Sequence, residues 1–200
     1  MKKIAIMAIM SVLSLTLFGQ VQFGPVIDLG LGFYSKTSDS LTLKGGIFPA
    51  FGVAMQQNLS QMLSLRGTAT YSFKSLQATK VNGGAVDKLN GQSVDFCLAG
   101  KFSNFTNDVH ALPYGMAGFG VAFNIVDKLQ KDYLVDCTYN QVAPYFNVGA
   151  GVGIKMSFLS ELDLSVNYSR FLVPMIKPSL PFDRTDARLN QFSIKIITLF

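Results

Sequence analysis

The chain contains 200 residues, of which 49% are apolar and only 14% are charged, so it fits a single domain. A soluble domain usually carries about 25% charged residues, so this sequence has too little charge for an ordinary solvated surface. The apolar content excludes a disordered chain, and the net charge of +5 is too small to indicate nucleic-acid binding. Two Cys and one His cannot supply a typical zinc site. We therefore expect no metal, no other cofactor and no nucleic-acid partner.

Residues 1–20 have the pattern of a secretory signal peptide. The stretch starts with Lys2 and Lys3, continues with an apolar run, and ends in Gly19 and Gln20. The alternative, a membrane anchor helix, needs about 20 apolar residues, whereas Ser and Thr residues interrupt this stretch. We predict secretion across the inner membrane and one mature domain over residues 21–200.

The mature chain alternates between apolar and polar residues with a period of two, which is typical of strands that have two unlike faces. Turn-rich stretches separate these segments from one another. The pattern predicts eight strands, which cover residues 25–34, 47–57, 63–74, 93–103, 113–125, 142–156, 161–169 and 191–200.

The connections between these segments alternate in length. Four are long, namely 35–46, 75–91, 126–141 and 172–188, and three are short, namely 58–62, 104–111 and 157–160. A tilted strand needs about 9 to 11 residues to cross a bilayer, and the segments meet or exceed that length. This layout predicts an all-β fold, an eight-stranded antiparallel up-and-down transmembrane β-barrel with its long loops outside the cell.

The polar faces of the strands combine charged residues with many glycines, and this favours a polar lumen and an apolar exterior. Glycines on a water-facing surface would weaken the strands without any gain. Aromatic residues also gather near both expected membrane boundaries, as in the aromatic girdles of such barrels. The predicted lumen network consists of Asp28, Arg66, Asp95, Lys101, Lys155, Glu161, Asp163 and Lys195. The alternative is a soluble lipocalin-like barrel that holds an apolar ligand inside.

Two glycine-rich strands, residues 114–120 and 147–153, precede the segment 162–169 and the terminal Phe200. With the eight strands, these features resemble the small outer-membrane β-barrel family of Bacteroidetes, often called PorT-like. The resemblance implies a Gram-negative outer membrane, contact with outer-membrane lipid, and Phe200 as the assembly signal that the barrel-assembly machinery reads. Some members of that family serve type IX secretion, and most have no known activity.

The sequence offers little that would support catalysis. Glu161 and Asp163 could act as an acid and base pair, but in a narrow lumen we expect them to pair with basic residues, which also disfavours a porin. Small outer-membrane enzymes that modify lipid A rely on a His near the outer side, whereas the only His, His110, lies in a short turn. We therefore expect a non-enzymatic protein, with a lipid-modifying enzyme as a weaker alternative.

Two further features concern the long loops. Cys97 and Cys137 form a candidate disulfide that would tether the third long loop in the oxidising periplasm. The fourth long loop is apolar and rich in proline, which favours extended segments, and exposed apolar patches often mark contacts. Our hypothesis is a surface for an unknown protein partner, used in secretion or attachment; the alternatives are a loop that packs over the barrel mouth and strand ends that extend beyond the membrane. Its candidate residues are Pro174, Met175, Ile176, Pro178, Pro181 and Phe182.

Overall fold

The structure is a computed structural model, and it describes residues 21–34, 41–60, 62–80, 86–103, 110–125, 137–156, 159–174, 176–178 and 188–200. The predicted signal peptide lies outside the described residues. Within the described ranges, no helix is long and apolar enough to cross a membrane.

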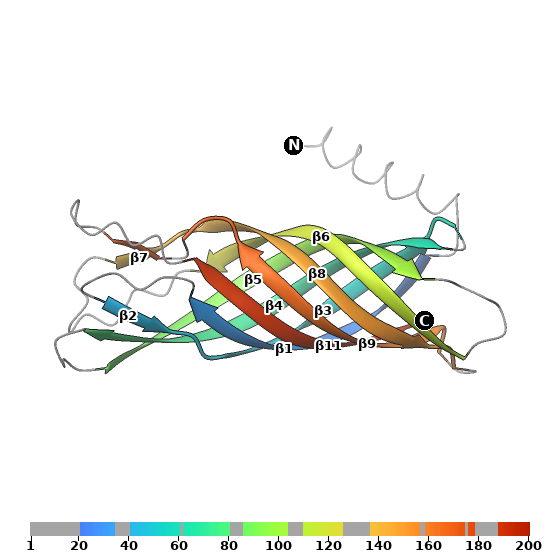
Figure 1. Ribbon diagram of the computed structural model, residues 1–200, viewed down its shortest axis with the longest axis horizontal. Coiled ribbons are helices and arrows are strands. Elements are labelled where there is room, and N and C mark those ends of the chain that lie inside the picture. Colours follow the sequence, from blue (N-terminus) through green and yellow to red (C-terminus); the bar gives the residue numbers. More distant parts are fainter. Residues whose placement is uncertain are drawn as a thin grey trace, which may run out of the picture.

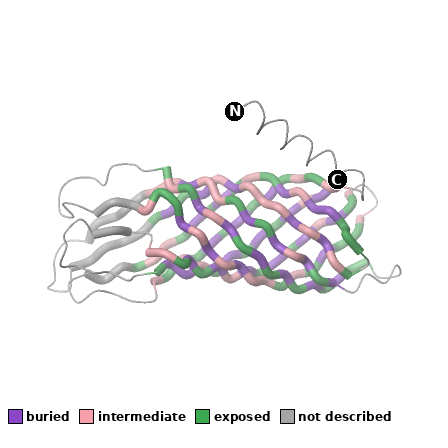
Figure 2. The backbone as a smooth tube through the Cα atoms, turned by 90° about the horizontal axis from the view of Figure 1, so that it is seen from above, coloured by how far each residue is buried: buried purple, intermediate pink, exposed green. Residues whose placement is uncertain are grey.

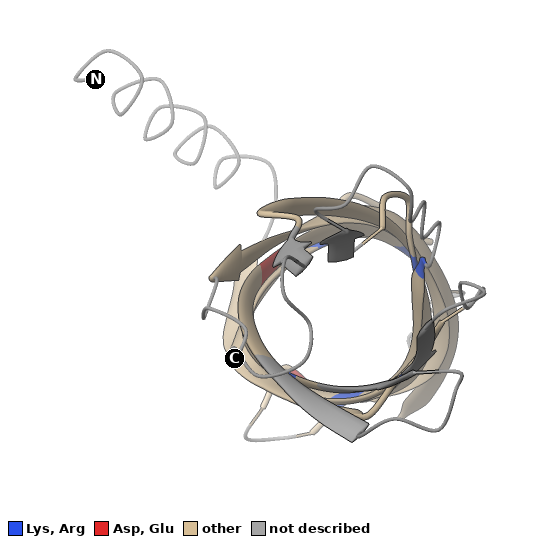
Figure 3. Cartoon of the chain, turned by 90° about the vertical axis from the view of Figure 1, so that its left-hand side faces the viewer, with Lys and Arg blue, Asp and Glu red and all other residues tan. Residues whose placement is uncertain are grey.

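Eight long strands form a closed antiparallel barrel (Figure 1). Each strand pairs with its neighbours in the chain, and β1 pairs with β11 to close the ring, which Figure 3 shows along its axis. This confirms the predicted up-and-down transmembrane barrel. The eight strands are β1 (Val21–Tyr34), β3 (Ile47–Asn58), β4 (Leu63–Lys80), β5 (Val86–Ser103), β6 (Ala111–Ile125), β8 (Val142–Ile154), β9 (Glu161–Phe171) and β11 (Leu189–Leu199).

Burial alternates along the eight long strands wherever it is described, as the purple and green bands of Figure 2 show. On β1, Asp28 is 7% exposed, whereas its neighbours Ile27 and Leu29 are 63% and 50% exposed. The polar face therefore points inward and the apolar face outward. The soluble lipocalin-like alternative is wrong, because it requires the opposite orientation of the two faces.

The β4–β5 hairpin extends beyond the rest of the barrel at the long-loop end. Its pairing continues as far as Thr79↔Val86, whereas β5 pairs with β6 only from Gln92↔Ile125. The sequence predicted a loop over residues 75–91, and this was wrong for both arms of the hairpin. Outside a membrane a strand needs no apolar face, so the two arms can stay paired without the alternation that marks the other strands.

Three short strands add to the same end of the barrel. β2 (Leu41–Lys44) pairs with the extended part of β4, and β7 (Cys137–Tyr139) pairs with β10 (Ile176–Pro178) in a separate two-stranded sheet. Both chain ends of the barrel lie at the opposite, short-turn end, where the Phe200 amide donates to the Phe23 carbonyl. The long-loop end is therefore the more elaborate of the two.

Aromatic side chains lie on the outer wall near each end. Phe33 stacks on Phe192 with 5.6 Å between ring centroids, and Tyr71 meets Phe73 edge to face near the long loops. Phe102 and Phe200 are exposed near the short turns. The sequence pattern also predicts Phe105 and Phe158 in the girdle at the short turns, and both lie outside the described residues.

We expect a charge on this outer wall to destabilise the barrel strongly. Val166 lies in the middle of β9 and is 57% exposed, so Val166→Arg should lower the free energy of unfolding by about 2–4 kcal/mol. Leu59, which follows β3 in a short turn and is 52% exposed, is the control, because an Arg near the interface costs only about 0–1 kcal/mol. Urea unfolding in lipid vesicles, followed by gel mobility, measures both. Equal losses for the two variants would contradict the placement of this wall in lipid.

Candidate functional site in the barrel lumen

The end of the lumen near the short turns holds a cluster of four buried charges. We call Arg66, Lys101, Glu161 and Asp163 the four-charge cluster. The Arg66 Nη2 lies 2.8 Å from Asp163 Oδ2, and the Lys101 Nζ lies 3.1 Å from the same oxygen. Lys101 also pairs with Glu161. These contacts join β4 and β5 to β9, on the other side of the lumen, because inward positions on all three strands reach the barrel axis.

Two neutral side chains complete the hydrogen bonding of this cluster. The Tyr114 hydroxyl donates to Asp163 Oδ1, and the Lys101 Nζ lies 4.2 Å from the Tyr114 ring centroid. The Gln56 side chain accepts a hydrogen bond from Arg66 and donates one to Glu161 Oε2 at a distance of 3.3 Å. The buried charges are thus both paired and hydrogen-bonded, which is the condition for tolerating them away from water.

A second ion pair lies at the seam where the barrel closes. Asp28 on β1 stands directly opposite Lys195 on β11 in the strand register, and Lys195 Nζ lies 3.5 Å from Asp28 Oδ2. Both residues are at least nine-tenths buried. This pair therefore links the first and last strands through their side chains as well as their backbones.

A third group of polar residues lies nearer the long loops. Lys74 Nζ is 3.7 Å from Asp95 Oδ1, and the hydroxyls of Ser72 and Ser93 donate to the Asp95 carboxylate at 2.9 and 2.8 Å. The Lys74 ammonium group also lies 5.3 Å from the centroid of the Phe171 ring. Across the described lumen, cations and carboxylates are equal in number, and each has an oppositely charged partner.

The space between the four-charge cluster and the seam pair is almost filled. A void there, bordered by Cys97 and Met116, has a volume of only about 10 Å³, which is roughly room for one water molecule. The lumen at this level is therefore a packed core and leaves no room for a substrate.

The structure places seven of the eight predicted lumen residues inside the barrel: Asp28, Arg66, Asp95, Lys101, Glu161, Asp163 and Lys195. The prediction for Lys155 was wrong. This residue follows the end of β8 at Ile154 and is exposed, with its amide bonded to the His110 carbonyl. The pattern extended this strand to Met156, which carried a turn residue into the lumen.

Three lumen residues were missed by the sequence analysis. Lys74, Tyr114 and Gln56 each occupy an inward position of a predicted strand, so the period-two pattern could have identified them. The predicted network contained charged residues only. It therefore left out the neutral partners Tyr114 and Gln56, and it also omitted Lys74, the last residue of its predicted strand.

Cys97 is a free, buried thiol, so the candidate disulfide with Cys137 was wrong. Cys97 lies in the middle of β5, opposite Gly120 on β6. Cys137 starts β7, which belongs to the separate sheet at the long-loop end, and a disulfide requires Cα atoms about 4.4–6.8 Å apart. The side chain of Cys137 is outside the described residues.

The other candidate residues lie away from the lumen. His110 is exposed at the short-turn end. Pro174 is half-buried and its carbonyl accepts from Asn140 at 3.3 Å. Ile176 and Pro178 belong to β10, without described side chains, while Met175, Pro181 and Phe182 lie outside the described residues. Among the described residues, no group of three or more His, Cys, Asp or Glu could hold a metal ion.

We expect the four-charge cluster to act as one unit. Arg66→Met leaves two carboxylates with one buried lysine, and removing one partner of a buried pair costs about 3–5 kcal/mol. Adding Asp163→Leu should recover part of that loss, because it removes the unpaired carboxylate. Arg170→Met is the control, because Arg170 is exposed. Equal stability of Arg66→Met and Arg170→Met in urea unfolding would refute the coupling.

No protein-family model and no curated protein matches this sequence. Among solved structures, the chain is similar to the outer membrane protein OprG from Pseudomonas aeruginosa, with a TM-score of 0.59 and 9% identity over 90% of this chain and 92% of that one. The N-terminal β-barrel domain of OprF from the same organism (TM-score 0.45, 14% identity, 90% and 100% covered) and the outer membrane enzyme PagL (TM-score 0.45, 13% identity, 86% and 97% covered) are also similar. At these identities the comparison with OprG shows the fold, which is that of a small outer-membrane β-barrel.

Proposed function

We propose that the protein is a non-enzymatic barrel of the outer membrane, whose closed lumen supports a surface for a protein partner at the long-loop end. The observation that carries this proposal is the contrast between the two ends. The short-turn end bears brief connections, whereas the long-loop end bears the extended β4–β5 hairpin, β2 and the β7–β10 sheet (Figure 1).

The packed lumen argues against a pore. Paired charges from β4, β5 and β9, with the Tyr114 hydroxyl of β6 bonded to them, cross the lumen at the level of Arg66 and Asp163. An ion that entered from the long-loop end would meet Lys74 and Asp95 first and then this second barrier. Permeation would require breaking buried pairs, which is strongly unfavourable.

The chemistry of the lumen also argues against an enzyme. Its carboxylates are held by cations and Tyr114 donates a hydrogen bond to Asp163, so these groups face each other and leave no open position for a substrate. The single histidine of the sequence is exposed at the other end from the long loops. A general base must lie within hydrogen-bond reach of its substrate proton, and His110 has no lumen carboxylate as an orienting partner among the contacts described.

The cellular setting follows from the same proposal. A signal peptide over residues 1–20 would direct export, and the terminal Phe200, exposed at the end of β11, would be read by the barrel-assembly machinery. The apolar wall would then lie in outer-membrane lipid. We place the protein among the PorT-like barrels of Bacteroidetes on the sequence resemblance alone, and a role beside secretion or surface attachment fits that placement.

Because the lumen is closed, we expect that the purified protein does not conduct ions. In planar lipid bilayers the wild type should give no current steps, because the four-charge cluster blocks the lumen. Replacing its four members together by Ser should produce steps, provided that the variant still shows the heat-dependent gel shift of a folded barrel. Steps from the wild type would contradict a closed lumen and favour a pore.

The partner surface is tested by shortening the long-loop end. Deleting residues 77–88 removes the paired tip of the β4–β5 hairpin, and deleting residues 174–182 removes β10 and the apolar loop. Both variants should fold and yet lose the protein that is crosslinked to the wild type on intact cells. A variant with residues 104–109 of a short turn replaced by Gly and Ser is the control and should retain it. An unchanged set of crosslinked proteins in both deletions would refute the proposal.

A further inference from the structure

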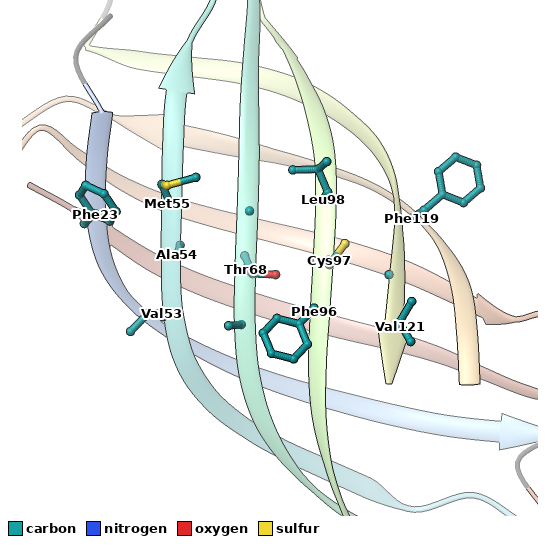
Figure 4. A pocket seen from close by; sticks show the side chains of 13 residues that line it. Phe23, Val53, Ala54, Met55, Thr68, Phe96, Cys97, Leu98, Phe119 and Val121 are labelled. Carbon is teal, nitrogen blue, oxygen red and sulfur yellow. The ribbon is translucent and has the colours of Figure 1, made fainter. Parts of the chain in front are cut away.

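The outer wall of the barrel has a hollow over β3, β4 and β5, at the level of Gly67 and Ala69. Its volume is about 450 Å³, within the range of about 300–1,000 Å³ that is typical of small-molecule sites. Figure 4 shows it from close by, with β4 in the middle and the side chains of Val53, Met55, Phe96 and Leu98 on both sides.

The strand register explains how the hollow forms. One row of paired outward positions runs Phe23, Met55, Gly67, Leu98 and Phe119 across five strands. The next row runs Val53, Ala69, Phe96 and Val121. In both rows the position on β4 is the smallest residue and its neighbours are large, so the wall is depressed along β4 and raised on either side.

Nothing in the barrel itself requires glycine at position 67. A Cβ built there meets no atom within 4 Å, whereas one at Gly52 or Gly118 would lie 2.0 or 2.2 Å from a backbone oxygen of the next strand. Those two glycines allow close strand packing, and Gly67 does not serve that purpose. A glycine inside a strand otherwise weakens it and often marks a place where another molecule approaches.

We propose that this hollow binds one acyl chain of a phospholipid from the leaflet at the short-turn end. The side chains that project into it are apolar, and the two polar residues at its floor, Thr68 and Cys97, occupy inward positions of their strands. No charged side chain lines it, so it offers no group for a phosphate or a peptide backbone. The hollow is continuous with the apolar wall, which a hydrocarbon chain already contacts in a membrane.

The position of the hollow along β3 and β4 favours the leaflet at the short-turn end. Gly67 lies near Leu63, where β4 begins at the short-turn end, and Met55 lies near Asn58, where β3 ends at the same side. A chain that enters from that side reaches the hollow directly. A second copy of the barrel is the competing occupant, and its binding would show as a dimer.

Because the sequence contains no Trp, a single introduced Trp is the only source of tryptophan fluorescence and can report lipid binding. Phe96→Trp places a fluorophore beside the hollow, and Phe192→Trp places one on another part of the wall, where the native Phe is equally exposed at 49%. Each protein is purified in detergent and titrated with a phospholipid that carries brominated acyl chains, which quench tryptophan on contact. We expect the signal of Phe96→Trp to fall and saturate at a stoichiometric amount of lipid. The signal of Phe192→Trp should fall only gradually as lipid accumulates in the micelle.

A second substitution fills the hollow. Gly67→Leu, added to the Phe96→Trp reporter, should raise the lipid needed for half-quenching at least about fourfold, since each methylene no longer buried weakens binding by roughly that factor. Gly115→Leu is the matched control, because a Cβ at Gly115 also meets no atom within 4 Å and this residue does not line the hollow. It should leave the titration unchanged.

The outcomes separate the candidate occupants. Identical curves for the two reporters, or no effect of Gly67→Leu in a protein that keeps its heat-dependent gel shift, would overturn the proposal. If Gly67→Leu does not fold, Ala69→Leu repeats the test at the neighbouring position. A dimer in detergent sedimentation that Gly67→Leu dissociates would also overturn it, because it would assign the hollow to a second copy of the chain.

Discussion

The pairing of the first and last strands is the constraint on which the rest of the structure depends. A bilayer offers no water to backbone groups, so a sheet can cross it only when every edge is closed. The ladder between β1 and β11 provides that closure, and it forces eight strands into a narrow ring. A ring of this size has an interior that side chains can fill. The paired charges at Arg66 and Asp163, the seam pair, and the small void between them all follow from that geometry.

The same closure decides which parts of the chain could be predicted from sequence. Within the membrane each strand has one face in lipid and one in the lumen, so the period of two identified the eight strands and the inward position of residues such as Asp28 and Glu161. Beyond the membrane that contrast disappears, and this is why the extension of β4 and β5 was predicted as a loop. The prediction for Lys155 failed for a related reason, because strand ends are set by backbone pairing that composition does not reveal.

Partner choice inside the lumen was beyond sequence analysis for a different reason. Arg66 and Asp163 are separated by 97 positions, and their contact depends on the stagger between strands that the turns and ladders produce together. The polar face shows that lumen charges need partners, yet it does not say which cation meets which carboxylate. Neutral residues such as Gln56 and Tyr114 complete the network because of their position, and their residue type alone gives little signal.

The lumen charges also help to define the stagger itself. A slip of one residue would turn every apolar side chain into the lumen, so the two faces already exclude it. A slip of two residues keeps both faces correct and shifts a strand by about 6.6 Å, and backbone pairing alone distinguishes such registers poorly. It would, however, separate Asp28 from Lys195 at the seam and leave both buried without partners. Because an unpaired buried charge costs several kcal/mol, these pairs disfavour the slipped barrels. Buried ion pairs can therefore specify the register of the strands whatever their net contribution to stability.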